Sequence, residues 1–165
     1  MIYLEKLKQK VSQQEQTLIG RKLLLRGLQM EYGLSEIPEI SFGIYGKPYF
    51  KTLGEIHFNI SHCDRGVVCI VSDNNVGIDI ECINPFDEEL AEYVANQEEL
   101  KVILNHPNPA LAFTILWTKK ESLCKLTGKG IDTRKEIQEI LSLNPVKFQT
   151  IINEAGGYVI TSCSI

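Results

Sequence analysis

Apolar residues recur at helical spacing through the first part of the chain, between residues 4 and 32. They stand among charged and amide residues at Leu7, Val11, Leu18, Leu25, Leu28 and Tyr32. This spacing predicts one long amphipathic helix over 4–32. Gly33 follows directly and suits the left-handed position that ends many helices.

Between residues 40 and 82 the apolar runs are shorter and typical of strands. Residues 40–44, 55–60 and 67–72 are predicted strands, with a turn at Tyr45-Gly46-Lys47-Pro48 between the first two. The segment Asp73-Asn74-Asn75 has the composition of a tight turn. We therefore expect 67–72 and 76–82 to form a hairpin.

The remaining sequence alternates helix and strand signals. Residues 87–104 are acidic and helix-forming, and a sharply bounded helix follows, with Asn108 as its N-cap, Pro109 in its first turn and Gly128 closing it. Residues 146–164 read as two strands joined at Glu154-Ala155-Gly156-Gly157. The pattern as a whole predicts a mixed helix and strand domain.

Composition adds the class of protein. A chain of 165 residues with 44% hydrophobic content fits one soluble domain. No apolar run approaches the roughly 18 residues of a membrane span, and the N-terminus lacks the apolar core of a secretory signal, so a cytoplasmic protein without membrane contact is expected. The five cysteines are an odd number without a Cys-x-x-Cys pair, which favours free, mostly buried thiols over a disulfide framework or a zinc site.

Charge is distributed unevenly. The net charge of −4 argues against a nucleic-acid partner, and residues 61–118 carry two basic and ten acidic side chains between mildly basic ends. An acidic middle of this kind suits a cation site bordered by phosphate-binding groups, although solvated surface charge would give the same count.

The acidic segment contains one pattern with specific chemistry, Val76-Gly77-Ile78-Asp79-Ile80-Glu81. Because strand side chains alternate, Asp79 and Glu81 share one face, where they repel each other unless a cation lies between them. Mg²⁺ fits, since it accepts a few carboxylates together with substrate phosphate oxygens. The alternative is a half-buried strand with a solvated acidic face.

The helix predicted after Asn108 carries a second pattern. Trp117, Glu121 and Lys125 fall at i, i+4 and i+8 and form one stripe. Glu121 is a candidate metal ligand or base, and Lys125 could neutralise charge on a phosphate. The alternative is an ordinary Glu–Lys pair with Trp117 in the core.

Two further residues have both a functional and a plain interpretation. His62, after Phe58-Asn59-Ile60-Ser61, donates a hydrogen bond to a phosphate or satisfies local backbone. Lys47 is an exposed lysine on a turn or a fixed phosphate contact.

Taken in order, these segments resemble the 4′-phosphopantetheinyl transferases of the surfactin-synthetase-activating type. The matching segments are Tyr45-Gly46-Lys47-Pro48, Phe58-Asn59-Ile60-Ser61-His62, Gly77-Ile78-Asp79-Ile80-Glu81 and Trp117-x-x-Lys120-Glu121-Ser122-x-x-Lys125. The resemblance implies an α+β fold of two similar halves, 1–83 and 84–165, with the site in the cleft between them. It implies Mg²⁺-dependent transfer of the phosphopantetheine arm of coenzyme A to a serine of an apo acyl or peptidyl carrier protein, releasing adenosine 3′,5′-bisphosphate.

By the same resemblance, each motif residue acquires a role. Asp79, Glu81 and Glu121 would bind magnesium, with Glu121 also a candidate base. Lys125 would support the diphosphate or leaving group, and Lys47, Ser61 and His62 would contact phosphates of coenzyme A. Two halves in one chain would allow a monomer to complete the site.

The sequence departs from the family's pattern in its N-terminal part. The N-terminal half is expected to be shortened, without the family's first strand and part of its basic region, and Gln16 stands where the family often has arginine. Weaker coenzyme A binding or recognition of its 3′-phosphate is expected. The alternatives are a degenerate coenzyme A or carrier-protein binding module and a magnesium-dependent phosphoesterase, and the pathway of the carrier, fatty-acid, polyketide or non-ribosomal peptide synthesis, stays open.

Overall fold

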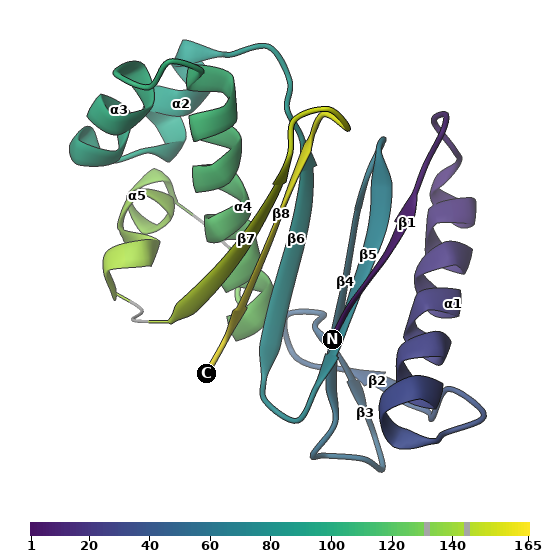
Figure 1. Cartoon of the computed structure of the whole chain (residues 1–165). Helices are drawn as coiled ribbons and strands as arrows, with labels where there is room; N and C mark the ends of the chain where they lie inside the picture. Colours follow the sequence, from purple (N-terminus) through teal and green to yellow (C-terminus); the bar gives the residue numbers. More distant parts are fainter. Residues whose placement is uncertain (131–132, 144–145) are drawn as a thin grey trace.

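A computed structural model describes residues 1–130, 133–143 and 146–165, and within them the strands form two three-stranded antiparallel sheets and one small hairpin (Figure 1). The first sheet has the order β1 (Ile2–Lys6), β5 (Gly66–Ser72), β4 (His57–Cys63). The second has the order β6 (Val76–Cys82), β8 (Tyr158–Ser164), β7 (Lys147–Asn153). The hairpin pairs β2 (Ile40–Phe42) with β3 (Pro48–Phe50).

Both sheets follow the same path of the chain. In each, a first strand leads to a long helix, and the last strand in sequence then pairs between the other two. The long helices are α1 (Gln13–Tyr32) and α4 (Pro109–Thr127), which lie on the outer faces of the first and second sheet (Figure 1). Three shorter helices, α2 (Glu88–Val94), α3 (Gln97–Leu104) and α5 (Arg134–Leu143), gather beside α4.

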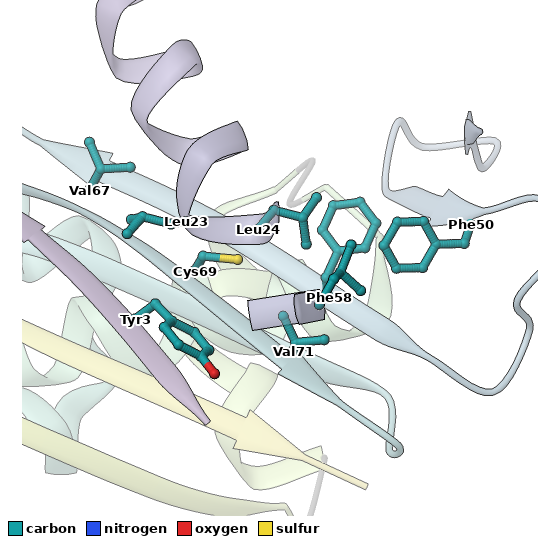
Figure 2. Close-up of a cluster of buried hydrophobic side chains, with 9 residues drawn as sticks. Tyr3, Leu23, Leu24, Phe50, Phe58, Val67, Cys69 and Val71 are labelled. Atoms are coloured by element: carbon teal, nitrogen blue, oxygen red, sulfur yellow. The ribbon is translucent and has the colours of Figure 1, made fainter. Parts of the chain in front are cut away.

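The first sheet is buried on both faces. Val67, Cys69 and Val71 of β5 pack with Leu23 and Leu24 of α1 in an apolar cluster (Figure 2). The alternate β5 residues belong to a second cluster that includes side chains of β6 and β8. Burial on both faces explains why β5 is a continuous apolar run rather than an alternating one.

The N-terminal prediction was wrong in its first part. Ile2–Lys6 form β1, which pairs with β5 in the register Tyr3 to Cys69, and the helix begins only at Gln13. Ser12 caps it in a capping box with Glu15, a start signal that the long apolar repeat concealed. The helix does end as predicted, with Gly33 at φ 68°.

The predicted hairpin after residue 72 was also wrong. β5 pairs with β1 and β4, whereas β6 pairs with β8, so the turn at 73–75 transfers the chain between sheets. The change of sheet therefore comes before the division between Ile83 and Asn84, and that division into halves stays a prediction.

The C-terminal predictions were more accurate. The helix over 87–104 is divided into α2 and α3 because Asn96 starts a new helix in a capping box with Glu99. The boundaries of α4 and the pairing of β7 with β8 are confirmed. The strands β1 and β3 and the helix α5 were not predicted.

Within the described parts of the chain, none of the helices has the length and apolar character needed to cross a membrane.

Candidate functional site

Strands β4 and β6 lie side by side without a backbone ladder, and two side chains of β4 connect them. Asn59 Oδ1 accepts a hydrogen bond from the Ile78 amide at 2.9 Å, and Ser61 Oγ accepts one from the Ile80 amide at 3.4 Å. We call this junction the seam. The seam explains the Asn-x-Ser sequence of β4. The two side chains accept hydrogen bonds from amides of β6 that β4 does not pair through its backbone.

Helix α4 packs against β6 so closely that position 77 must be glycine. A Cβ on Gly77 would clash with the Ser122 carbonyl oxygen and the Leu126 amide. Backbone contact at this point brings the stripe of Trp117, Glu121 and Lys125 onto the carboxylate face of β6. Gly77 therefore sets the distance between the two sequence motifs.

A compact polar cluster lies where the seam meets α4. The Lys125 ammonium donates to Asp79 Oδ1 at 2.6 Å and to Ser61 Oγ at 2.7 Å, and Ser61 Oγ donates to Asp79 Oδ1 at 2.9 Å. Asp79 is only 2% exposed. Because Asp79 is buried, removal of Lys125 would leave its carboxylate charge without a partner, which is costly.

Glu81 lies next to this cluster and is held by Trp117. The Trp117 indole Nε1 donates to Glu81 Oε1 at 3.2 Å, and the Trp117 ring stacks on Phe113. Burial, followed by the negative charge of Asp79, raises the pKa of Glu81 to about 7, against the opposing effects of Trp117 and Lys125. The aromatic residue of the stripe is thus a hydrogen-bond partner of the second carboxylate.

Glu121 occupies the middle of the stripe, half-buried between Trp117 and Lys125. Burial and the neighbouring Asp79 raise its pKa, and Lys125 opposes that shift. It lines a pocket of about 290 Å³ together with Tyr93, Cys124 and Thr133. Glu121 is therefore accessible from a cavity while remaining within the electrostatic influence of the cluster.

The carboxylates have the chemistry of a magnesium site, although they are not gathered as one. Asp79 Oδ2 is buried without a hydrogen-bond partner, and the elevated pKa values of Glu81 and Glu121 arise partly from Asp79. A cation would relieve both features. Among the residues that the structure describes, however, no three His, Cys, Asp or Glu side chains are placed to hold a metal ion. In this structure the cation next to Asp79 is the Lys125 ammonium.

The structure separates Ser61 from His62. Ser61 faces the seam, whereas His62 is exposed and lies on the same face of β4 as Phe58 and Ile60, which pack toward α1. The two residues therefore lie on opposite faces of β4.

Lys47 is not displayed on its turn as the sequence suggested. Its ammonium donates to Asn75 Oδ1 at 2.6 Å and to the carbonyl oxygens of Leu126 at 2.7 Å and Val76 at 3.2 Å. Burial lowers the pKa of this amine. These bonds attach the loop before β3 to the start of β6 and the end of α4.

A pocket of about 250 Å³ opens beside Lys125. Its lining includes Lys47, Asn59, Lys125 and Lys129, so three lysines border one hollow. Such a surface attracts anions.

Sequence reasoning missed three residues that build the site. Asn59 forms the seam, Gly77 permits the approach of α4, and Lys120 anchors α4 from behind. Lys120 is fully buried and donates to Glu99 and to carbonyl oxygens of α2 and α5. The sequence Lys119-Lys120 does not show which of the two lysines is buried.

Replacing Glu81 by glutamine is expected to change how stability depends on pH. A pKa raised from 4.5 to about 7 means that the folded state favours the protonated carboxyl. Its stabilising contribution is complete below about pH 4.5 and is lost as the pH rises through 7. After reduction for partial solvent exposure, we expect Glu81→Gln to be more stable than the wild type by about 1 to 2 kcal/mol at pH 8.

Urea unfolding at pH 5 and pH 8 in the presence of a chelator checks this expectation. Glutamine retains the oxygen that accepts from Trp117, so the packing of the indole is preserved. The matched control is Glu98→Gln, at an exposed surface carboxylate. If Glu81→Gln changed stability equally at pH 5 and pH 8, the raised pKa of Glu81 would be contradicted.

Comparisons with known proteins identify the family of this chain. Residues 75–161, which contain β6 and α4, match the family model described as the 4′-phosphopantetheinyl transferase superfamily. A 4′-phosphopantetheinyl transferase of Bacillus subtilis is 40% identical over 119 residues, covering 70% of this chain and 53% of that protein. The family-model match over residues 75–161 includes all three carboxylates and Lys125, whereas Lys47, Ser61 and His62 lie before residue 75.

Two further relatives carry related descriptions. The 4′-phosphopantetheinyl transferase Sfp of Bacillus subtilis strain 168 is 35% identical over 119 residues, covering 70% of this chain and 53% of that protein. The 4′-phosphopantetheinyl transferase AcpT of Salmonella typhimurium is 37% identical over 116 residues, covering 67% of this chain and 57% of that protein. The chain spans about half the length of the curated relatives it matches.

Proposed function

Because this chain belongs to the 4′-phosphopantetheinyl transferase superfamily, we propose that it transfers the phosphopantetheine arm of coenzyme A to a serine of an apo acyl or peptidyl carrier protein. The products are the holo carrier protein and adenosine 3′,5′-bisphosphate. The reaction is proposed to need Mg²⁺. A monomer suffices if the site is built between the halves 1–83 and 84–165.

One observation carries the proposal: Lys125, Ser61 and Asp79 meet at the seam beside a lysine-lined pocket. The pocket supplies positive charge for the diphosphate of coenzyme A, and the adjoining carboxylates supply oxygen ligands for a cation. Phosphoryl transfer needs charge neutralisation and positioning more than any covalent partner from the protein. The arrangement meets both needs at one place.

The three carboxylates of the cluster are the proposed magnesium ligands. Asp79, Glu81 and Glu121 would hold the magnesium ion, and Asp79 Oδ2 is the buried oxygen with no other partner. The ion, when bound, would supply a positive charge to phosphate oxygens. Trp117 keeps Glu81 oriented toward the cluster through its indole N–H.

Glu121 and Lys125 act on opposite sides of the reacting phosphorus. Glu121 takes the proton from the carrier serine hydroxyl as that oxygen forms a bond to phosphorus, and burial raises the pKa of Glu121, which makes it a stronger proton acceptor. The bond from that phosphorus to the diphosphate bridging oxygen breaks. Lys125 stabilises the negative charge that develops on the leaving group.

Lys47, Ser61 and His62 are the proposed contacts for the phosphates of coenzyme A. Ser61 borders the Lys125 cluster and can hydrogen-bond a phosphate there. Lys47 lines the pocket, but its ammonium must leave one of three acceptors to bind a phosphate. His62 would serve only a part of coenzyme A that reaches the α1 side of β4.

Intact mass of an apo acyl carrier protein tests the function. Incubation with this protein, coenzyme A and Mg²⁺ should add one phosphopantetheine group per carrier, and a chelator should prevent the gain. Binding of coenzyme A without any mass gain on several acyl and peptidyl carriers would indicate the binding module instead. Phosphate release without a carrier would indicate the phosphoesterase.

A further inference from the structure

Two of the five cysteines lie at the end of the seam, outside the chemistry assigned above. Cys63 is the last residue of β4, and Cys82 is the last residue of β6. Both thiols are free and half-buried, whereas Cys69, Cys124 and Cys163 are buried. Cys63 and Cys82 are therefore the two least buried of the five cysteine residues.

The register of the seam places these thiols opposite each other. The bonded pairs Asn59 with Ile78 and Ser61 with Ile80 advance two residues along each strand. The next step in the same direction pairs Cys63 with Cys82. Strand alternation puts the Cys63 side chain on the face of β4 that carries Asn59 and Ser61.

The apolar cluster between the two sheets supports the same placement. Cys63 packs against this cluster, which contains Ile78 and Ile80 of β6. Cys82 shares the face of β6 on which those two isoleucines lie. Both thiols thus border one cluster, and burial together with the neighbouring Cys82 thiol raises the pKa of Cys63 to about 12.

Solvent reaches Cys82 through a separate cavity. Cys82 lines a pocket of about 320 Å³ with Lys10, Asp64 and Arg65, and Asp64 and Arg65 form the turn directly after Cys63. The Arg65 amide donates to Cys63 Sγ at 3.4 Å.

We propose that Cys63 and Cys82 form an oxidation site that closes into a disulfide across the seam when the protein meets a hydroperoxide. With hydrogen peroxide as the oxidant, the Cys82 thiol, which lines the cavity, is oxidised to a sulfenic acid and the peroxide is reduced to water. The second thiol then attacks that sulfur, forming the S–S bond and releasing a second water. The new bond joins the two sheets one residue beyond Glu81, and a thiol reductant reverses it.

Mass spectrometry of the peroxide-treated folded protein tests this proposal directly. We expect the intact monomer to lose two hydrogens, non-reducing digestion to yield one linked peptide containing Cys63 and Cys82, and a thiol reductant to restore the original mass. The other three cysteines should remain free to alkylation after unfolding. Gain of oxygen atoms at either thiol without a linked peptide, or a disulfide between two chains, would overturn the proposal.

Single variants provide the matched comparison. Cys63→Ser and Cys82→Ser should each abolish the loss of two hydrogens, whereas Cys163→Ser should retain it. Circular dichroism confirms the fold of each variant, and the peptide mapping of the wild-type protein decides the question even if one variant does not fold. A linked peptide that persists in Cys82→Ser would refute the assignment.

Discussion

Replacing Glu121 by glutamine is expected to reduce modification of an apo carrier protein by about 100- to 10,000-fold while the fold stays intact. The substitution retains the size and the hydrogen-bonding oxygen of the side chain but removes its capacity to accept a proton. It also removes one of the three carboxylates proposed for magnesium. Initial rates of carrier mass gain at saturating Mg²⁺ measure the effect.

The location of Glu121 is the reason for so large a loss. Its carboxyl lies on the α4 stripe between Trp117 and Lys125, within the field of Asp79, and it lines a cavity. Burial raises its pKa, so the ionised form already costs the folded state free energy. Removing that charge should therefore leave stability unchanged or slightly increased, and a loss of activity cannot be attributed to unfolding.

Two controls separate the mechanism from general charge effects. Glu98→Gln makes the same substitution at an exposed α3 carboxylate paired with Lys101, and it should transfer at the wild-type rate. A Mg²⁺ titration of Glu121→Gln shows whether excess metal restores activity, which would assign Glu121 to metal binding rather than proton transfer. Near-wild-type transfer by Glu121→Gln would remove the residue from the mechanism.

The sequence predicted the two faces of the site because both depend on local periodicity. Alternation along β6 placed Asp79 and Glu81 together, and the i, i+4, i+8 spacing placed Trp117, Glu121 and Lys125 on one stripe of α4. The structure confirms that this stripe contacts the carboxylate face, through Lys125 on Asp79 and Trp117 on Glu81. Caps at Asn108 and Gly128 fixed the bounds of α4 for the same local reason.

What the sequence did not reveal depends on pairing between distant segments. The turn at 73–75 looks the same whether the following strand folds back or crosses to another sheet, and only the partner β8 decides the matter. Likewise, alternation puts Ser61 and His62 on opposite faces of β4, but only the distant segments β6 and α4 decide that the site lies on the Ser61 face. Side-chain hydrogen bonds are equally invisible in the sequence: Lys47 had two interpretations and Lys120 had none, and both ammonium groups donate to carbonyl oxygens of distant segments.

Replacing Lys120 by methionine is expected to lower the free energy of unfolding by about 3 kcal/mol. The Lys120 side chain is 0% exposed, and its ammonium lies 2.7 Å from Glu99 Oε2. It also donates to the Ile137 carbonyl oxygen at 2.7 Å and to the Val94 carbonyl oxygen at 3.0 Å. One cation thus connects α4 to α2, α3 and α5, and methionine fills the space without satisfying any of these acceptors.

The magnitude follows from the asymmetry of buried ion pairs. Placing an ammonium in this interior is costly, and burial lowers the pKa of Lys120 accordingly. Removing it, however, leaves the Glu99 carboxylate and two carbonyl oxygens without their donor, which costs more than the pair itself contributed. Urea denaturation followed by circular dichroism measures the loss. Lys101→Met, which breaks the exposed pair with Glu98, should change stability by less than about 1 kcal/mol.

A double-mutant cycle with Glu99 decides whether the unpaired carboxylate causes the loss. Glu99 also accepts from the Asn96 amide in the capping box of α3, and glutamine can preserve that bond. If the stranded charge dominates, Lys120→Met costs clearly less in a Glu99→Gln background than in the wild type. An equal cost in both backgrounds would assign the loss to the α2 and α5 carbonyl oxygens. A loss below about 1 kcal/mol in the single variant would show that Lys120 is not the anchor of these helices.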